Sequence, residues 1–189
     1  MEDRQYPKGK RVLCYIIDLG IIFTISLLLV KFAVKPVMNM SDAERNRILS
    51  RIVHDDIIPR VKPGALDKIR FHKDRNDRLV IVTSTVDYLV KHIAKELGFT
   101  DYIAAPMEII DGKLTGNTCG LVPYQEGKVT RIKNFLKENQ LTLDDSYAYG
   151  DSINDLPMLQ ICEHKFAIDP NEVLLKHPQF KELKVEHWG

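Results

Sequence analysis

Short apolar runs alternate with amphipathic segments over most of the chain. Each run strings together β-branched, small or aromatic residues, as strands buried on both faces do. The segments between the runs repeat apolar residues at helical spacing, for example Val86, Leu89, Val90 and Ile93. This alternation predicts right-handed βαβ units, and therefore an α/β fold with a parallel sheet covered by helices on both faces. The predicted strands lie at 79–82, 102–105, 147–149 and 165–168.

Turn and capping residues separate these elements. Ser41 followed by Glu44 is a capping-box pattern, which predicts a helix that runs to about Val53. Asp111-Gly112 between short β segments predicts a hairpin, and Gly127-Lys128 opens another helix. The tail 171–189 is predicted to close the domain as a helix and an extended end.

The run Val12–Val30 departs from this alternation. Its apolar residues are interrupted at only a few positions, it approaches the length of a membrane span, and basic residues flank both ends. No small-residue cleavage site comes after it, which argues against a secretory signal. Asp18 near its middle would be costly in lipid unless it were paired. Three alternatives stay open: a buried strand plus helix of a soluble domain, a hydrophobic helix that touches a membrane, and a single membrane span.

Composition narrows the class of protein. The 189 residues suffice for one domain with a small insert. The 27 basic and 26 acidic residues give a net charge of +1. Proteins that bind nucleic acid usually carry an excess of basic residues, so this balance gives no electrostatic argument for nucleic-acid binding. Cys14, Cys119 and Cys162 are widely spaced and form no Cys-x-x-Cys, so we expect neither a disulfide framework nor a zinc site, and a cytoplasmic location.

Polar residues gather where the predicted strands end. Thr83, Asp151 and Asp169 each fall at the carboxyl end of a predicted strand, and Lys128 lies at the start of a helix. The carboxyl ends of parallel strands meet at one edge of a sheet, and ligands bind beyond that edge. We therefore expect these side chains to form an active site.

Asp151 and Asp155 are the candidate metal ligands. Two carboxylates held close together repel each other unless a cation lies between them, and hard oxygen ligands suit Mg²⁺. The alternative is a solvated turn in which these residues act as ordinary turn and capping residues. Asn154 also has two interpretations: it orients the metal ion or the phosphate, or it caps a helix.

Thr83, Ser84 and Lys128 are candidates for holding an anion. The hydroxyls of Thr83 and Ser84, with nearby N–H groups, suit phosphate, although both residues could simply cap a helix. A lysine at a helix start is slightly unfavourable for the helix dipole, so an anionic partner would explain Lys128 better; the alternative is an exposed surface lysine. With a metal ion these groups would clamp a transferring phosphoryl group. Such a reaction still requires a nucleophile, normally a carboxylate.

Thr83, Gly127-Lys128 and the segment Gly150–Asp155 resemble the second, third and fourth motifs of the haloacid-dehalogenase superfamily, in the same order and at matching spacing. The amino-acid sequences of segments 81–99, 107–116, 126–132 and 147–159 are most similar to those of the phosphoserine-phosphatase-like branch. The resemblance covers about residues 55–170. It implies a Rossmann-like, three-layer core with a small helical cap, and Mg²⁺-dependent hydrolysis of phosphomonoesters through an aspartyl-phosphate.

The resemblance also implies a division into domains and a class of partners. Residues 1–75 are assigned to a helical, hydrophobic cap region, with a degenerate first core strand at 11–18 as an option, and 76–189 to the core. The substrate is expected to be a small phosphorylated molecule selected by the cap. Apolar caps in this branch resemble those of enzymes acting on lipid-linked phosphates. Contact with the inner face of a membrane through Val12–Val30 is therefore an open alternative.

The family's first motif, a strand ending in Asp-x-Asp-x-Thr or Val, does not occur in this chain. The nearest candidate is Cys14–Gly20, in which Asp18 would be a weak candidate for the nucleophile and Gly20 stands where the second aspartate should be. The alternative that we favour is that residues 6–11 and the apolar run after them are already cap sequence, with the first strand upstream of Met1.

The sequence supports two hypotheses for the function of this protein. The first is a domain of phosphatase lineage, truncated or inactive, whose metal and phosphate sites are present and whose nucleophile is missing or degenerate. The second is a non-catalytic phosphate-binding or membrane-associated module on the same scaffold.

Overall fold

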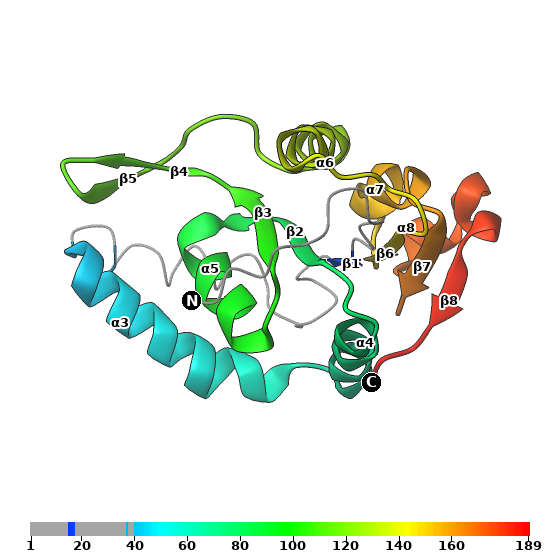
Figure 1. The fold of residues 1–189 in the computed structure, drawn as a ribbon, viewed down its shortest axis with the longest axis horizontal. Helices are drawn as coiled ribbons and strands as arrows, with labels where there is room; N and C mark the ends of the chain where they lie inside the picture. The colour runs from blue at the N-terminus through cyan, green and yellow to red at the C-terminus, as the bar shows by residue number, and fades with distance from the viewer. Residues whose placement is uncertain (1–14, 18–36, 38–39) are drawn as a thin grey trace.

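A computed structural model describes residues 15–17 (as backbone), 37 and 40–189. Figure 1 shows the arrangement of the elements. The helices are α3 (Asp42–Ile52), the π-helical turn Val53–Ile57, the 3-10 turn Ile58–Arg60, α4 (Pro63–Asp74), α5 (Asp87–Leu97), α6 (Glu126–Asn139), the 3-10 turn Ile153–Asp155, α7 (Leu156–Gln160), α8 (Glu172–Leu175) and the 3-10 turn Pro178–Glu182. The strands are β1 (Tyr15–Ile17), β2 (Leu79–Val86), β3 (Asp101–Ala105), β4 (Met107–Ile110), β5 (Lys113–Thr118), β6 (Tyr147–Gly150), β7 (His164–Ile168) and β8 (Lys184–Glu186).

The main sheet has the order β3-β2-β1-β6-β7-β8, and every described pairing in it is parallel. β1 lies in the middle, where Ile16 pairs with Val80 of β2 on one side and Ala148 of β6 on the other. The central position that we had assigned to a strand upstream of Met1 is thus filled from within the chain, and that hypothesis is wrong. The order of the strands reverses at β1, and in such sheets the ligand crevice opens at this point.

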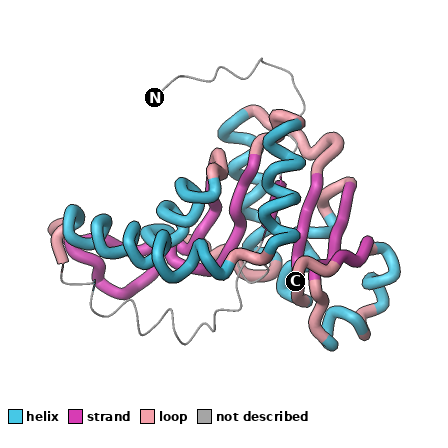
Figure 2. The backbone as a smooth tube through the Cα atoms, turned by 90° about the horizontal axis from the view of Figure 1, so that it is seen from below, coloured by secondary structure: helices cyan, strands magenta, loops and turns pink. Residues whose placement is uncertain are grey.

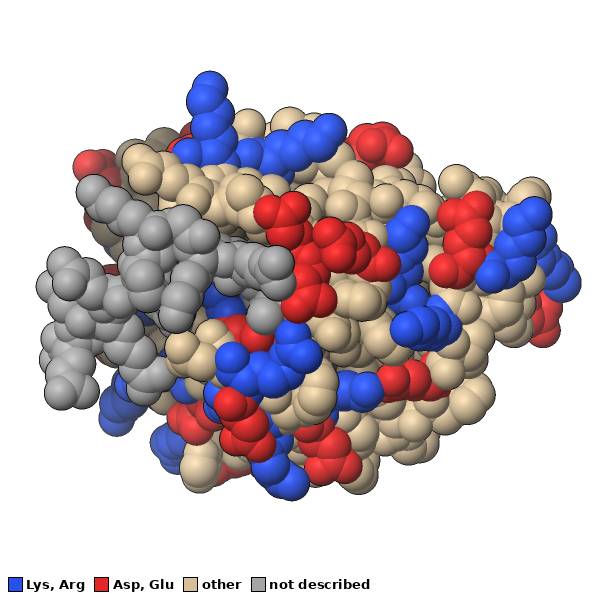
Figure 3. All heavy atoms as spheres, turned by 45° about the vertical axis from the view of Figure 1, so that its right-hand side comes forward, with Lys and Arg blue, Asp and Glu red and all other residues tan. Residues whose placement is uncertain are grey.

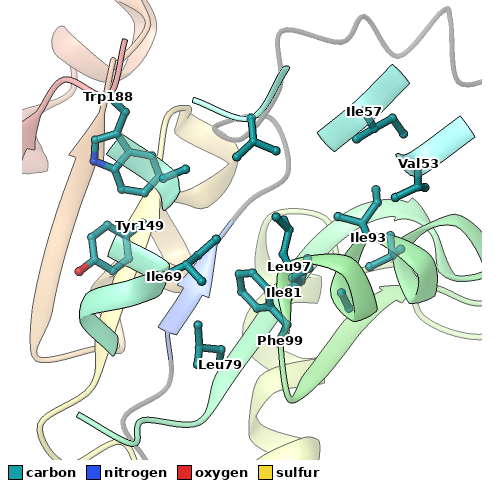
Figure 4. Packing of buried hydrophobic residues seen from close by; sticks show 14 of the residues in the cluster. Val53, Ile57, Ile69, Leu79, Ile81, Ile93, Leu97, Phe99, Tyr149 and Trp188 are labelled. Atoms are coloured by element: carbon teal, nitrogen blue, oxygen red, sulfur yellow. The ribbon is translucent and has the colours of Figure 1, made fainter. Parts of the chain in front are cut away.

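Helices cover both faces of this sheet (Figures 1 and 2), as the alternation of strand and helix predicts. Odd-numbered residues of β2, such as Ile81, pack with α4 and α5 on one face, together with Tyr149 and Trp188 (Figure 4). Even-numbered residues, such as Val82, pack with α6 and α7 on the other face. Because successive side chains of a strand point to opposite faces, each apolar run supplies both layers of core.

The predicted hairpin is confirmed as β4 and β5, a separate two-stranded antiparallel sheet. Asp111 and Gly112 take φ values of 50° and 75°, which a tight hairpin turn requires. The predicted capping box of α3 is also confirmed, because Ser41 and Glu44 bond reciprocally. Arg45 on α3 donates to the Gly112 carbonyl oxygen (3.4 Å), so the hairpin turn and α3 lie side by side.

The run Val12–Val30 lies outside the described residues except for β1. Because Tyr15–Ile17 is a strand of the sheet, the run cannot be one continuous spanning helix. No helix in the described part of the chain is both long and apolar enough to cross a membrane. Acidic and basic side chains are interspersed over the face shown in Figure 3.

The helix α4 falls within residues 1–75, which the sequence assigns to a cap. Its residues Ala65 and Ile69 belong to the same core cluster as Ile81 and Tyr149 of the sheet. Its first turn also contacts the end of the chain, because the Gly64 N–H donates to the Trp188 carbonyl oxygen (3.1 Å). The division at residue 75 stays a prediction.

A buried hydrogen-bonded chain ties α4 to the sheet. His72 is 0% exposed; its Nδ1 lies 2.6 Å from Asp77 Oδ2 and its Nε2 lies 3.0 Å from the Tyr149 hydroxyl. Burial lowers the pKa of His72 and outweighs Asp77, whose hydrogen bond and charge raise it. His72 is therefore held neutral inside the fold.

We expect the free energy of unfolding to fall as the pH falls from 7 to 5. The pKa of His72 is lower in the folded than in the unfolded chain, where it is near 6.5, so below that pH the unfolded chain binds more protons. The loss is at most about 1.4 kcal/mol per pH unit for each proton. Urea denaturation at several pH values measures it. His72→Gln should lose part of the pH dependence and His54→Gln, on a side chain that is 70% exposed, should keep it. Equal slopes for the wild type and His72→Gln would contradict the assignment.

Candidate active site

The carboxyl ends of four parallel strands, β2, β1, β6 and β7, meet at one edge of the sheet. Thr83 lies in β2, Asp151 directly follows β6, and Asp169 directly follows β7. Ile17 ends β1, between β2 and β6. The next residue in the sequence, Asp18, lies outside the described residues, as does Gly20. The structure thus brings the predicted strand-end residues to one edge.

Lys128 and Asp155 form a buried ion pair at this edge. They are 2% and 0% exposed, and Lys128 Nζ contacts Asp155 Oδ1. Lys128 lies in the first turn of α6, which is closely packed, since a Cβ on Gly127 would lie 2.5 Å from the Val122 carbonyl oxygen. Asp155 is therefore an anionic partner of the kind that a lysine at a helix start needs.

The second carboxylate oxygen of Asp155 holds the turn that carries Asp151. Asp155 Oδ2 accepts hydrogen bonds from the Asp151 N–H (3.2 Å), the Ser152 N–H (3.2 Å) and the Ser152 hydroxyl (3.0 Å). Gly150 permits this approach, because a Cβ there would lie 2.5 Å from the Asp155 Cβ. Both oxygens of Asp155 thus face donors of the protein, and Asp155 fixes Lys128 and the Asp151 turn relative to each other.

Thr83 is 2% exposed. Its hydroxyl donates a hydrogen bond to the Thr85 hydroxyl and accepts one from the Thr85 N–H, both at 3.2 Å. The alternative that Thr83 and Ser84 cap a helix is wrong, because β2 runs on to Val86 and α5 begins after it. The reason is strand pairing: Val86 lies opposite Ala105 of β3, beyond a register shift. Ser84 is half-buried in the same stretch of strand.

Asn154 is half-buried in the 3-10 turn after β6, and its Oδ1 accepts a hydrogen bond from Gln125 Nε2 (3.1 Å). Gln125 immediately precedes α6 and has φ 47° and ψ −120°. Gln125 is not predictable as a site residue from the sequence, because a glutamine carries no signal for a positive φ.

Asp169 lies at the predicted strand end, where it holds the last residues of the chain. It accepts hydrogen bonds from Lys62 Nζ (2.9 Å), His187 Nδ1 (3.0 Å) and the Trp188 N–H (3.3 Å). Burial alone would raise the pKa of the Asp169 carboxyl, but the hydrogen bonds from Lys62, His187 and Trp188 outweigh it and lower the pKa.

A second group of potential metal ligands lies at the opposite, amino-terminal edge. In the described ranges, Asp145, Glu163 and His164 each place a ligand atom within 4.8 Å of the others. Asp145 already accepts hydrogen bonds from His164 Nε2 (2.9 Å) and from Arg75 (3.4 Å). Asp145 is thus already engaged by side chains of the protein.

Comparison with known proteins identifies the family of this chain. A family model described as haloacid dehalogenase-like hydrolase matches residues 5–160. A histidinol-phosphatase of Neisseria meningitidis is 30% identical over 155 residues, which cover 80% of this chain and 70% of that protein. The chain spans only about half the length of two further curated relatives, from Mycobacterium tuberculosis.

Solved structures agree on the fold. A Bordetella pertussis protein of unknown function matches with a TM-score of 0.74 and 29% identity, covering 85% of this chain and 74% of that one. A phospho-aspartyl intermediate analogue of phosphoserine phosphatase matches with a TM-score of 0.61 and 23% identity over 93% of both chains, which supports the fold alone. The predicted Rossmann-like α/β core is confirmed, as is the similarity to the phosphoserine-phosphatase-like branch. The chain belongs to the haloacid dehalogenase-like hydrolases.

Proposed function

We propose that this protein is a Mg²⁺-dependent phosphomonoester hydrolase that acts on a small phosphorylated substrate. The observation that carries the proposal is the buried Lys128–Asp155 pair beside Asp151, at the carboxyl edge next to β1. The charge that develops on phosphoryl oxygens needs fixed cations and donors around it, and a buried ammonium is worth more there than in water.

Asp151 is the residue that we propose to hold the metal ion. Its carboxylate directly follows β6, is half-buried, and supplies the hard oxygen that Mg²⁺ prefers. Asp155, the other predicted ligand, directs both oxygens to donors of the protein and so suits an anchoring role behind Asp151. When bound, Mg²⁺ would neutralise charge on the phosphoryl oxygens.

Asp18 is the proposed nucleophile, because it follows the last residue of the central strand. Its carboxylate would attack the phosphorus atom, the bond from phosphorus to the leaving oxygen would break, and water would later release phosphate from Asp18. The leaving oxygen needs a proton, and Gly20 has no carboxyl group to supply one. We therefore expect slow turnover of alkyl phosphates and faster turnover of aryl phosphates, whose leaving groups need less help.

The experiment is phosphate release from an aryl phosphate by the purified chain, with and without Mg²⁺. We expect activity that requires Mg²⁺, that falls roughly 10²–10³-fold in Asp151→Asn, because several kcal/mol of charge stabilisation are lost, and that disappears in Asp18→Asn. Asp144→Asn is the matched control, because Asp144 is exposed and precedes the amino-terminal end of β6 in the chain. Activity unaffected by Asp151→Asn would overturn the metal site. Histidinol phosphate and phosphoserine are the first natural substrates to compare, since proteins similar to this one are named for them.

The second candidate function is a phosphate-binding module without turnover, which Gly20 at the place of the second carboxylate favours. Its signature would be saturable binding of inorganic phosphate that requires Mg²⁺, together with no release of phosphate from either an aryl or an alkyl ester.

A further inference from the structure

We propose that Gln125 is a positioning residue for the phosphate site: it orients the carboxamide of Asn154 toward the bound phosphate. The inference rests on the proposed function, and it takes Asn154 in the phosphate-orienting role that the sequence allows for it.

The backbone of Gln125 takes a conformation that its residue type disfavours. Its φ of 47° and ψ of −120° lie in a region that is sparsely populated by residues other than glycine. Such strain persists only where the surroundings impose it. Here the Gly127 N–H donates to the Tyr124 carbonyl oxygen (2.8 Å), and Gly127 packs so closely on Val122 that it has no room for a Cβ. The approach to α6 is therefore fixed on both sides of Gln125.

This conformation lets Gln125 contact two parts of the site. Its carbonyl oxygen accepts a hydrogen bond from the Lys128 N–H (3.0 Å), and its side-chain Nε2 donates to Asn154 Oδ1 (3.1 Å). The turn that carries Lys128 and the turn after β6 are thus joined twice, by the buried Lys128–Asp155 pair and by the exposed Gln125–Asn154 pair.

In the structure, the hydrogen bond to Gln125 has Asn154 Oδ1 as its acceptor. Asn154 Oδ1 is directed to Gln125, so the Nδ2 group is at the other end of the planar carboxamide. A phosphate oxygen accepts hydrogen bonds, so it is attracted to an amide N–H and repelled by an amide oxygen. Holding the oxygen away therefore selects the orientation of Asn154 that binds an anion.

The test measures the Kd of inorganic phosphate by calorimetry in the presence of Mg²⁺. Gln125→Met keeps the length of the side chain and removes the hydrogen bond, and we expect it to weaken phosphate binding about three- to tenfold, the usual effect of losing one hydrogen bond. Gln140→Met is the matched control, because Gln140 ends the same helix, also at a positive φ (56°). We expect its Kd to equal that of the wild type.

Two further variants separate positioning from stability. In an Asn154→Ala background, Gln125→Met should have no additional effect on the Kd, because Gln125 acts through Asn154. Gln125→Gly should bind phosphate as weakly as Gln125→Met while melting no lower than the wild type, because glycine adopts a positive φ without strain.

Unchanged phosphate binding in Gln125→Met, alongside weakened binding in Asn154→Ala, would overturn the inference and leave the proposed function standing. Equal weakening by Gln125→Met with and without Asn154 would also overturn it. A wild type that shows no saturable phosphate binding with Mg²⁺ would overturn the proposed function and the inference with it.

Discussion

Replacing Asp155 by asparagine is expected to lower the free energy of unfolding by about 3–5 kcal/mol, the usual cost of breaking a buried pair. Lys128 and Asp155 are almost completely buried, so the substitution removes the negative charge opposite an ammonium group that water cannot reach. Asparagine has nearly the same shape and can still accept hydrogen bonds from the turn at Ser152, which confines the loss mainly to charge. Urea denaturation at pH 7, with Asp144→Asn as the exposed control, measures the effect.

The partner substitution makes this prediction sharper. Lys128→Met leaves the Asp155 carboxylate with its hydrogen bonds from Asp151 and Ser152, so we expect a smaller loss than for Asp155→Asn. The double variant Lys128→Met/Asp155→Asn has no unpaired charge at this position and should be more stable than the sum of the single effects predicts. Additive effects would mean that the two charges do not interact, contrary to the structure.

The two aspartates of the motif show what spacing alone can predict. The segment from Gly150 to Asp155 placed both carboxylates at a strand end, and the structure puts them there. From spacing they looked equivalent, because burial depends on residues far away in the chain. Lys128 reaches Asp155 across 27 positions and fixes it inside the protein, and Asp151 stays half-buried at the edge. Local pattern thus predicted that both aspartates lie at a strand end, and only the packing distinguished the buried, hydrogen-bonded Asp155 from the half-buried Asp151.

Elements defined by local chemistry were predicted well. The capping box at Ser41 and the Asp111-Gly112 turn depend on residues within a few positions, and both form as expected. The strand β1 was ambiguous because it is three residues inside a long apolar run, with no periodicity to mark its bounds. Its pairing with β2 and β6 is non-local and therefore not visible in the sequence. The same holds for the end of β2, which pairing with Ala105 extends through residues that look like helix caps.

Replacing Trp188 by alanine is expected to lower the free energy of unfolding by about 3–5 kcal/mol, the usual cost of truncating a buried aromatic side chain. Trp188 is 4% exposed and packs in the same core as Ile69 of α4 and Tyr149 of β6, whose ring centroid lies 5.6 Å away (Figure 4). At about 2–4 °C per kcal/mol for a domain of this size, the melting temperature should fall by on the order of 10 °C. Val185→Ala on β8 is the control, because that side chain is 46% exposed and should change stability by less than about 0.5 kcal/mol.

A substitution at Gly64 tests the same packing around Trp188. A Cβ at Gly64 would lie 2.7 Å from the Trp188 Cβ, so Gly64→Ala should destabilise the protein by about 1–3 kcal/mol through overpacking. Part of that clash is with the indole ring, which is absent in Trp188→Ala, and the double variant should therefore lose less stability than the two single variants combined. If the losses simply add, Gly64 and Trp188 do not share a contact in solution, and the junction between the start of α4 and the last residues must be built differently.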